Sequence, residues 1–139
     1  MNCIFCKIIN KEIPADFIYE DAEAIAILDV HPKAPGHTMV LPGIHCENIL
    51  DLPDEKIEGL FKAVKRATEM LKSSLMPDGF TIGINHGKAS GQAIDHLHIH
   101  IIPRWRNDGG GSMHSVVDNP LKESIEQIKG KITGGANYE

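Results

Sequence analysis

Three histidines, His96, His98 and His100, alternate with apolar residues in the stretch DHLHIHIIPR. Successive side chains of a β-strand point to opposite faces, so a strand would place the three imidazoles on one face and the apolar residues on the other. Neighbouring imidazoles would then stand about 6.5–7 Å apart at the backbone. This spacing suits two imidazoles that bracket a phosphate or share a metal ion, and the residues alone leave both possibilities open.

The segment NHGKASGQAID, just before the histidines, has the composition of an anion-binding loop. It contains Gly87 and Gly91 among small residues, and backbone N–H groups in such a loop can turn inward toward an anion. A neutral imidazole can attack phosphorus, because the pKa of histidine is ordinarily about 6.5. We therefore predict that His98 forms a covalent nucleotidyl-histidine and that His100 stabilises charge on the phosphate oxygens.

A second set of candidate metal ligands begins at Cys3 and Cys6, which have the spacing of half a zinc site. No second Cys-x-x-Cys follows, so further ligands would come from distant residues: His45, Cys46 or one triad histidine. Two buried helix cysteines are an equally good interpretation at this point. An H-x-H pair can also chelate zinc, which keeps a zinc-dependent hydrolase open as a rival mechanism.

Length and composition indicate an ordinary globular protein. The 139 residues carry a formal net charge of −5, which fits one domain and offers no basic stripe for nucleic acid. The three cysteines form no even framework, and the start of the chain is too polar for a signal peptide. No apolar run approaches the roughly 20 residues of a membrane span. We expect a soluble, cytoplasmic protein that binds a small molecule rather than nucleic acid or a membrane.

Apolar periodicity predicts five short strands, one long helix and shorter helices near both ends. The sheet would be antiparallel, with the apolar backs of its strands packed on the long helix, which makes the fold α+β and leaves the histidine face open. The predicted helices cover 3–10, the region between Pro53 and Pro77, and Pro120 to Lys131; the predicted strands cover 17–20, 24–30, 37–42, 80–85 and the stretch from His96 toward Pro103.

These segments together resemble the histidine triad (HIT) family of nucleotide hydrolases and transferases. The resemblance covers about Cys3 to Arg104 and rests on NHGKASGQAIDHLHIHIIPR, CIFCKIINKEIP and LDVHPKAPGHTMVLPGIH. It implies a single HIT domain over 1–139, with a core of about 3–104 and a helical C-terminal extension over 105–139. It also implies a homodimer that hydrolyses the α-phosphate of nucleoside phosphoramidates or (di)nucleoside polyphosphates and releases AMP or GMP. A nucleotide-binding adaptor without catalysis is the alternative.

The resemblance also implies a role for individual residues. His98 would be the nucleophile and His100 would contact the α-phosphate, with His37 as a supporting histidine behind them. The phosphate loop would consist of Asn85, Gly91, Gln92 and Ala93, and the purine nucleoside would lie against Phe5, Ile8, Ile27, Leu28, Asp29 and Val30, with Asp29 on the ribose hydroxyls. A microbial branch of the family holds a structural zinc with residues that match Cys3, Cys6, His45 and His96.

Two residues depart from the family pattern. Ala93 stands where some phosphoramidate-cleaving members carry a serine that donates to the leaving-group nitrogen, so the preferred leaving group is not implied. Asp95 replaces an aromatic residue or a proline. Its carboxylate could accept a hydrogen bond from His96 or act through its charge on a triad imidazole.

Overall fold

The computed structural model describes residues 2–134. Its elements follow the order α1 (Ile4–Ile9), β1 (Phe17–Glu20), β2 (Ala24–Leu28), β3 (Thr38–Pro42), α2 (Asp54–Leu75), β4 (Gly79–Gly83), the short 3₁₀ helix η1 (Lys88–Ser90), β5 (Ile99–Arg104), the 3₁₀ helix η2 (Met113–Ser115) and α3 (Ile125–Gly134). The chain forms two compact units, the first ending at Gly109 and the second beginning at Gly110. All predicted site residues belong to the first unit.

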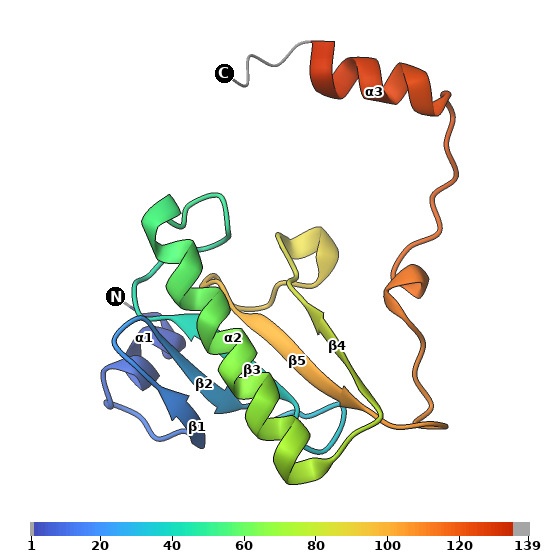
Figure 1. Ribbon diagram of the computed structural model, residues 1–139. Coiled ribbons are helices and arrows are strands. Elements are labelled where there is room, and N and C mark those ends of the chain that lie inside the picture. The colour runs from blue at the N-terminus through green and yellow to red at the C-terminus, as the bar shows by residue number, and fades with distance from the viewer. Residues whose placement is uncertain (1, 135–139) are drawn as a thin grey trace. The chain divides into compact units, whose positions relative to one another are not determined.

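The five strands form one sheet in the order β1-β2-β3-β5-β4, and every neighbouring pair is antiparallel. Figure 1 shows this sheet with α2 running across one of its faces. The predicted α+β architecture is therefore confirmed. Strand β5 lies between β3 and β4, so the strand that carries His100 is in the interior of the sheet, and β4 is an edge strand.

Helix α2 covers one face of the sheet because its apolar residues recur every three or four positions. Asp54 and Glu55 in its first turn complement the helix dipole. The helix ends at Leu75, and the residue that caps it, Met76, has a left-handed φ of 51° just before Pro77. Its buried residues are Leu60, Ala63, Val64, Ala67 and Leu71. Neither α2 nor any other helix within residues 2–134 has the length and apolarity to cross a membrane.

The opposite face of the sheet has a separate apolar cluster, to which α1 contributes Phe5 and Ile8. Strand β2 joins the two clusters through its alternating side chains. Its alanines lie in the α2 cluster, whereas Ile25 and Ile27 lie in the α1 cluster. The sheet is thus buried on both faces along β2, and α1 is held close to the histidine segment.

Several predicted boundaries differ from the structure; β4, for example, covers Gly79–Gly83 rather than 80–85. Strand β2 ends at Leu28 rather than at residue 30, and β5 begins at Ile99, after His96 and His98. Helix α3 begins at Ile125, because Ser124 and Gln127 form a reciprocal capping box: each side chain accepts from the other residue's backbone N–H, at 2.9 and 3.1 Å. The prediction of a helix start at residue 120 missed this signal.

Candidate active site and metal centre

The histidine face follows the predicted alternation even though β5 begins only at Ile99. Leu97, Ile99 and Ile101 are buried in the α2 cluster, so the histidines between them point to the other face of the sheet. The rings of His98 and His100 lie 4.9 Å apart between centroids. His98 is 8% exposed and His100 is half-buried, so the two imidazoles form a shielded pair.

The position of the proton on His98 is set by a backbone carbonyl. Nδ1 of His98 lies 2.8 Å from the carbonyl oxygen of His96. A carbonyl oxygen can only accept, so Nδ1 carries the hydrogen and donates it. In the neutral ring, Nε2 therefore keeps its lone pair, which is the form that a nucleophilic imidazole needs.

A relay of hydrogen bonds sets the opposite arrangement on His100. The backbone N–H of Lys33 donates to Nδ1 of His37 at 3.0 Å, so neutral His37 carries its proton on Nε2. That Nε2 lies 2.9 Å from Nδ1 of His100 and donates to it. Neutral His100 must then carry its own proton on Nε2, where it is available as a hydrogen-bond donor to an anion.

Burial keeps both members of this relay neutral. The pKa of His37 is lowered mainly by burial, against an opposing effect of Asp29, whose carboxylate lies 3.5 Å from Nε2. The pKa of His100 is lowered to about 4 by burial and by the neighbouring imidazoles of His98 and His37. At neutral pH both rings are uncharged, as the relay requires.

The lowered pKa of His100 predicts a loss of stability in acid. The unfolded chain takes up the proton near pH 6.5, whereas the folded protein binds it only near pH 4, so the free energy of unfolding falls as the pH drops from 6.5 to 4. The share of His100 is at most about 3 kcal/mol. Urea unfolding across this pH range should show a shallower pH dependence for His100→Gln than for the wild type. Equal slopes would contradict the assignment.

The glycine-rich loop is fixed mainly by Gln92. Its side-chain amide donates to the carbonyls of Glu47 and Ile94 at 2.7 and 3.0 Å and accepts from the N–H of Gly87 at 2.8 Å. Gly91 has a φ of 105°, a conformation that favours glycine. A Cβ added there would lie 3.8 Å from the amide nitrogen of Asn85, so Asn85 and Gly91 are adjacent. Ala93, two residues further on, is exposed.

The residues predicted to bind the nucleoside differ strongly in burial. Phe5, Ile8 and Ile27 are buried, Leu28 is half-buried, and Val30 is 77% exposed. The ring of Phe5 packs edge-on against His98, at 5.2 Å between centroids. Asp29 comes directly after β2, where its carboxylate accepts from the N–H of His31 at 2.8 Å.

The structure brings Cys3, Cys6, His45 and His96 together, with one potential ligand atom from each within 4.8 Å of all the others. Cys3 Sγ lies 3.4 Å from His96 Nδ1, and Cys6 Sγ lies 3.3 Å from His45 Nδ1. The two Nδ1 atoms lie 3.3 Å apart. Ligand atoms of a tetrahedral zinc site lie about 3.3–3.8 Å apart, given the usual bond lengths. These three distances therefore fall within the range of a tetrahedral zinc site.

Histidine 96 presents the correct nitrogen to this cluster. Its Nε2 lies 3.2 Å from the carbonyl oxygen of Pro42, so Nε2–H donates there and Nδ1 keeps a lone pair for a metal ion. Burial and the adjacent Cys3 thiol raise the pKa of Cys6, and a bound cation would favour its thiolate.

Cys46, which the sequence also offered as a metal ligand, lies in the α2 cluster instead. Asp95 is exposed, and both ring nitrogens of His96 have other partners.

Sequence reasoning missed the backbone groups that orient the imidazoles, namely the N–H of Lys33 and the carbonyl of Pro42. Backbone donors and acceptors have no signature in residue type, so only the folded structure could reveal them. The predicted alternation of the histidines nevertheless identified all three imidazoles correctly as a cluster on one face.

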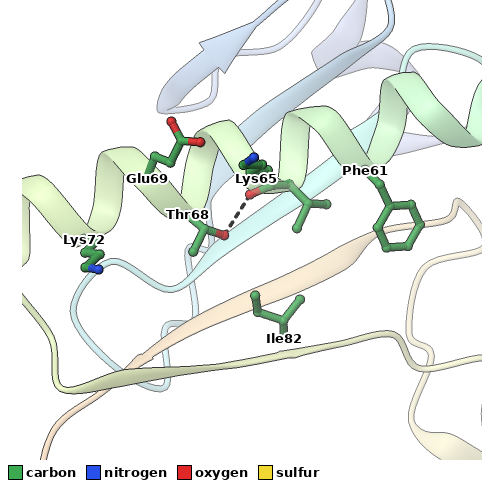
Figure 2. Close-up of a pocket in the computed structure, with 7 residues that line it drawn as sticks. Phe61, Lys65, Thr68, Glu69, Lys72 and Ile82 are labelled. Carbon is green, nitrogen blue, oxygen red and sulfur yellow. Dashed lines mark hydrogen bonds between the residues drawn. The ribbon is translucent and has the colours of Figure 1, made fainter.

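A pocket between α2 and β4 was also missed. Figure 2 shows Phe61 on α2 and Ile82 on β4 at its two sides, with Lys65, Thr68, Glu69 and Lys72 along the helix. Phe61 is 43% exposed and Ile82 is 40% exposed. Phe80 and Ile84 lie on the same face of the sheet as Ile82 and pack against the core. The alternation of the strand was visible in the sequence, but the exposure of Ile82 was not.

Comparisons with known proteins agree with this geometry. The family profile described as "HIT domain" matches residues 10–107. An uncharacterised HIT-like protein of Methanocaldococcus jannaschii is 45% identical over 129 residues, which cover 92% of this chain and 99% of that protein. A protein of Arabidopsis thaliana named an adenylylsulfatase is 36% identical over 121 residues, which cover 87% of this chain and 61% of that protein.

Solved structures share the fold. A member of the HIT family from Bacillus subtilis superimposes with a TM-score of 0.87 and 34% identity over the whole of both chains. A histidine triad family protein from Mycobacterium smegmatis, described as zinc-bound, has a TM-score of 0.73 and 33% identity and covers 93% of this chain and 89% of that one. The predicted HIT-type fold is therefore confirmed.

Proposed function

This chain belongs to the HIT family, and on that premise we propose that it is a hydrolase that releases a nucleoside monophosphate through a covalent intermediate on His98. The observation that supports this most directly is the hydrogen bond from His98 Nδ1 to the His96 carbonyl at 2.8 Å, which leaves Nε2 as a free nucleophile. The Arabidopsis relative named an adenylylsulfatase supports hydrolysis at a nucleotide phosphate.

In the first step, Nε2 of His98 attacks the α-phosphorus and a phosphorus–nitrogen bond forms. The bond to the leaving group breaks, and the leaving group departs with the electron pair and is then protonated. Nε2–H of His100 donates to a non-bridging oxygen, where negative charge increases in the transition state. In the second step, water attacks phosphorus, the bond to His98 breaks, and the nucleoside monophosphate is released.

The glycine-rich loop would hold the phosphate beside His98. We propose that Asn85, Gly91 and the backbone of Ala93 face the phosphate, because Asn85 and Gly91 are adjacent and Ala93 is exposed. The side chain of Gln92 already bonds to the loop at three positions, so its role would be to shape the loop. Asp29 would accept hydrogen bonds from the ribose hydroxyls. The purine base, adenine or guanine, would lie against five apolar residues: Phe5, Ile8, Ile27, Leu28 and Val30.

Zinc is the metal that the four-residue cluster would hold. Two thiols and two imidazoles form a complete ligand set, so the ion would fix the start of the chain to the histidine segment. The zinc-bound Mycobacterium smegmatis relative supports this choice. We propose a structural role for the zinc, with hydrolysis carried out by His98 and His100.

The test is to follow nucleotide release from adenosine phosphoramidate, diadenosine tetraphosphate and adenylylsulfate, and to quench the reaction in acid. We expect AMP from at least one substrate and a label on His98 from a substrate labelled in the α-phosphate. Turnover without label on His98 would eliminate the covalent mechanism. Tight AMP binding without turnover of any substrate would favour the adaptor. Turnover that leaves no label on His98 and that stops completely when the metal is removed from the folded protein would favour the zinc-dependent hydrolase.

We further propose a homodimer that forms through β4 and α2. Strand β4 is at the edge of the sheet, and the pocket beside it exposes Phe61 and Ile82. Lys65, Glu69 and Lys72 line the same pocket, so two copies related by a twofold axis could pair opposite charges around an apolar centre. A continuous sheet across two β4 strands would also satisfy the open backbone edge.

Phe61→Glu is expected to abolish this dimer, because it places a charge in the apolar centre of the proposed interface. Met70→Glu is the matched control, since Met70 is 42% exposed on the same helix but outside the pocket. Light scattering coupled to size exclusion would report the mass. A monomeric wild type, or an unchanged mass for Phe61→Glu, would rule out this interface.

We also propose that the chain is a single HIT domain with a C-terminal extension and that it resides in the cytoplasm. The family match over residues 10–107 supports a HIT domain with a core of about 3–104, followed by an extension over 105–139 that contains α3. We propose Cys3 and Cys6 as metal ligands, and Cys46 packs in the α2 cluster. Cysteines used in these ways suit a reducing compartment such as the cytoplasm.

A further inference from the structure

The metal cluster and His98 share two direct connections. The carbonyl of His96, one of the proposed metal ligands, accepts from Nδ1 of His98 at 2.8 Å. Phe5 lies between the two cysteines in sequence, is 3% exposed, and packs edge-on against both rings, at 5.9 Å from His96 and 5.2 Å from His98. Any change that moves Cys3, Cys6 or His96 will therefore act on the imidazole of His98 through two separate contacts.

Cys3 and Cys6 are also close enough to react with each other. Their sulfur atoms lie within 4.8 Å, and the backbone N–H of Cys6 donates to Sγ of Cys3 at 3.4 Å. A disulfide needs a sulfur–sulfur distance of about 2 Å, so the sulfurs would have to approach by no more than about 3 Å. Both cysteines are half-buried, whereas Cys46 is only 6% exposed and packs in the α2 cluster. Oxidants should therefore reach Cys3 and Cys6 before Cys46.

We propose that Cys3 and Cys6 are an oxidation site at which a hydroperoxide forms a disulfide, releases the metal ion and displaces the imidazole of His98. This inference rests on the proposed function, both for the metal ligands and for the role of His98. The site would thereby make nucleotide hydrolysis sensitive to the redox state of two residues that do not contact the nucleotide phosphate.

The oxidation is a balanced two-electron reaction. The thiolate of one cysteine attacks a peroxide oxygen, the oxygen–oxygen bond breaks, and the other half of the peroxide leaves as an alcohol or water after taking up a proton. The sulfenic acid that forms is attacked by the second thiolate, the sulfur–sulfur bond forms, and hydroxide leaves as water after protonation. Two of the four metal ligands are withdrawn in this way, and the two imidazoles that remain hold the ion weakly.

The test uses the full-length protein after its zinc content has been measured. Hydrogen peroxide is added in steps while zinc release is followed with a chromogenic chelator, the cysteines by peptide mass spectrometry, and the His98 ring by ¹⁵N NMR. We expect a Cys3–Cys6 disulfide to form in proportion to zinc release, a shift of the His98 Nδ1–H signal, and a fall in kcat of about 10- to 100-fold. A dithiol together with zinc should reverse all four changes, which excludes irreversible unfolding.

Two variants separate the parts of the inference. Cys46→Ala should respond to peroxide as the wild type does. Phe5→Leu keeps all four ligands, so it should still form the disulfide and release zinc, but the His98 signal should already be shifted before peroxide is added.

Several results would overturn the inference: sulfinic acid in place of a disulfide, a disulfide without zinc release, or zinc release that leaves kcat and the His98 signal unchanged. A purified protein without zinc would instead refute the proposed metal centre. If peroxide forms the disulfide and releases zinc but no substrate is hydrolysed, the proposed hydrolase activity is refuted. The NMR signal of His98 then still shows whether oxidation of the cysteines moves the His98 imidazole.

Discussion

His98→Ala is expected to lower kcat for nucleotide hydrolysis by about 10⁴-fold or more, which corresponds to about 5 kcal/mol of transition-state stabilisation. The substitution removes Nε2, the atom that we propose attacks phosphorus, and no other imidazole can take its place. His100 carries its proton on Nε2, because the relay through His37 fixes its Nδ1 as an acceptor. His96 directs Nδ1 to the metal cluster and Nε2–H to Pro42.

The measurement compares steady-state kcat with AMP affinity in the same variant. AMP should still bind, because His98 contributes to the chemical step and the loop and Asp29 remain in place. His86→Ala is the control, since His86 is an exposed loop residue outside the proposed machinery. A fall of less than tenfold in His98→Ala, with the fold intact by circular dichroism, would show that another group attacks phosphorus.

Removal of zinc is expected to lower the free energy of unfolding by several kcal/mol. The cluster joins the start of the chain at Cys3 and Cys6 to His45, after β3, and to His96, before β5. These four residues meet only in the folded protein, so the free energy of binding the proposed zinc would contribute to stability. The effect should be smaller than the about 10–16 kcal/mol of zinc-finger peptides, because this chain has two apolar clusters of its own.

The experiment measures the metal content of the purified protein and then the melting temperature before and after treatment with a chelator. Cys6→Ser should lower both zinc content and melting temperature. Cys46→Ala should retain the zinc, because the Cys46 side chain packs in the α2 cluster and is not one of the four clustered ligands. An unchanged melting temperature in protein shown to be free of metal would refute a stabilising role for the site.

Much of the fold could be predicted because its elements are strongly patterned. Helix α2 follows a stripe of apolar residues that ends at Pro77, and the alternation of histidines with Leu97, Ile99 and Ile101 identified the face that carries them. The alternation persists where the regular strand has not yet begun, since burial of every second side chain in the α2 cluster constrains the backbone there.

Other features depend on contacts between residues distant in sequence. The proton position on His100 depends on the backbone of Lys33, through His37, and the proton position on His96 depends on the carbonyl of Pro42. The residue types alone left His45, Cys46 and the triad histidines open as metal ligands, and the family resemblance favoured His45 and His96. The structure brings these two histidines together with Cys3 and Cys6, whereas Cys46 packs in the α2 cluster. The start of α3 was a local signal, the Ser124 and Gln127 pair, and could have been found.

The hydrogen bonds of Gln92 have a consequence for the kinetics of nucleotide binding. They hold the glycine-rich loop through contacts within the chain itself, and a residue that had to become ordered during binding would cost about 1–2 kcal/mol of conformational entropy. The conformational entropy of the glycine-rich loop is therefore lost when the protein folds and not when a nucleotide binds. If the loop binds the nucleotide phosphate as we propose, the nucleotide would meet a loop that is already ordered. We therefore expect its rate of capture to be governed by diffusion and orientation and not by a rearrangement of the loop.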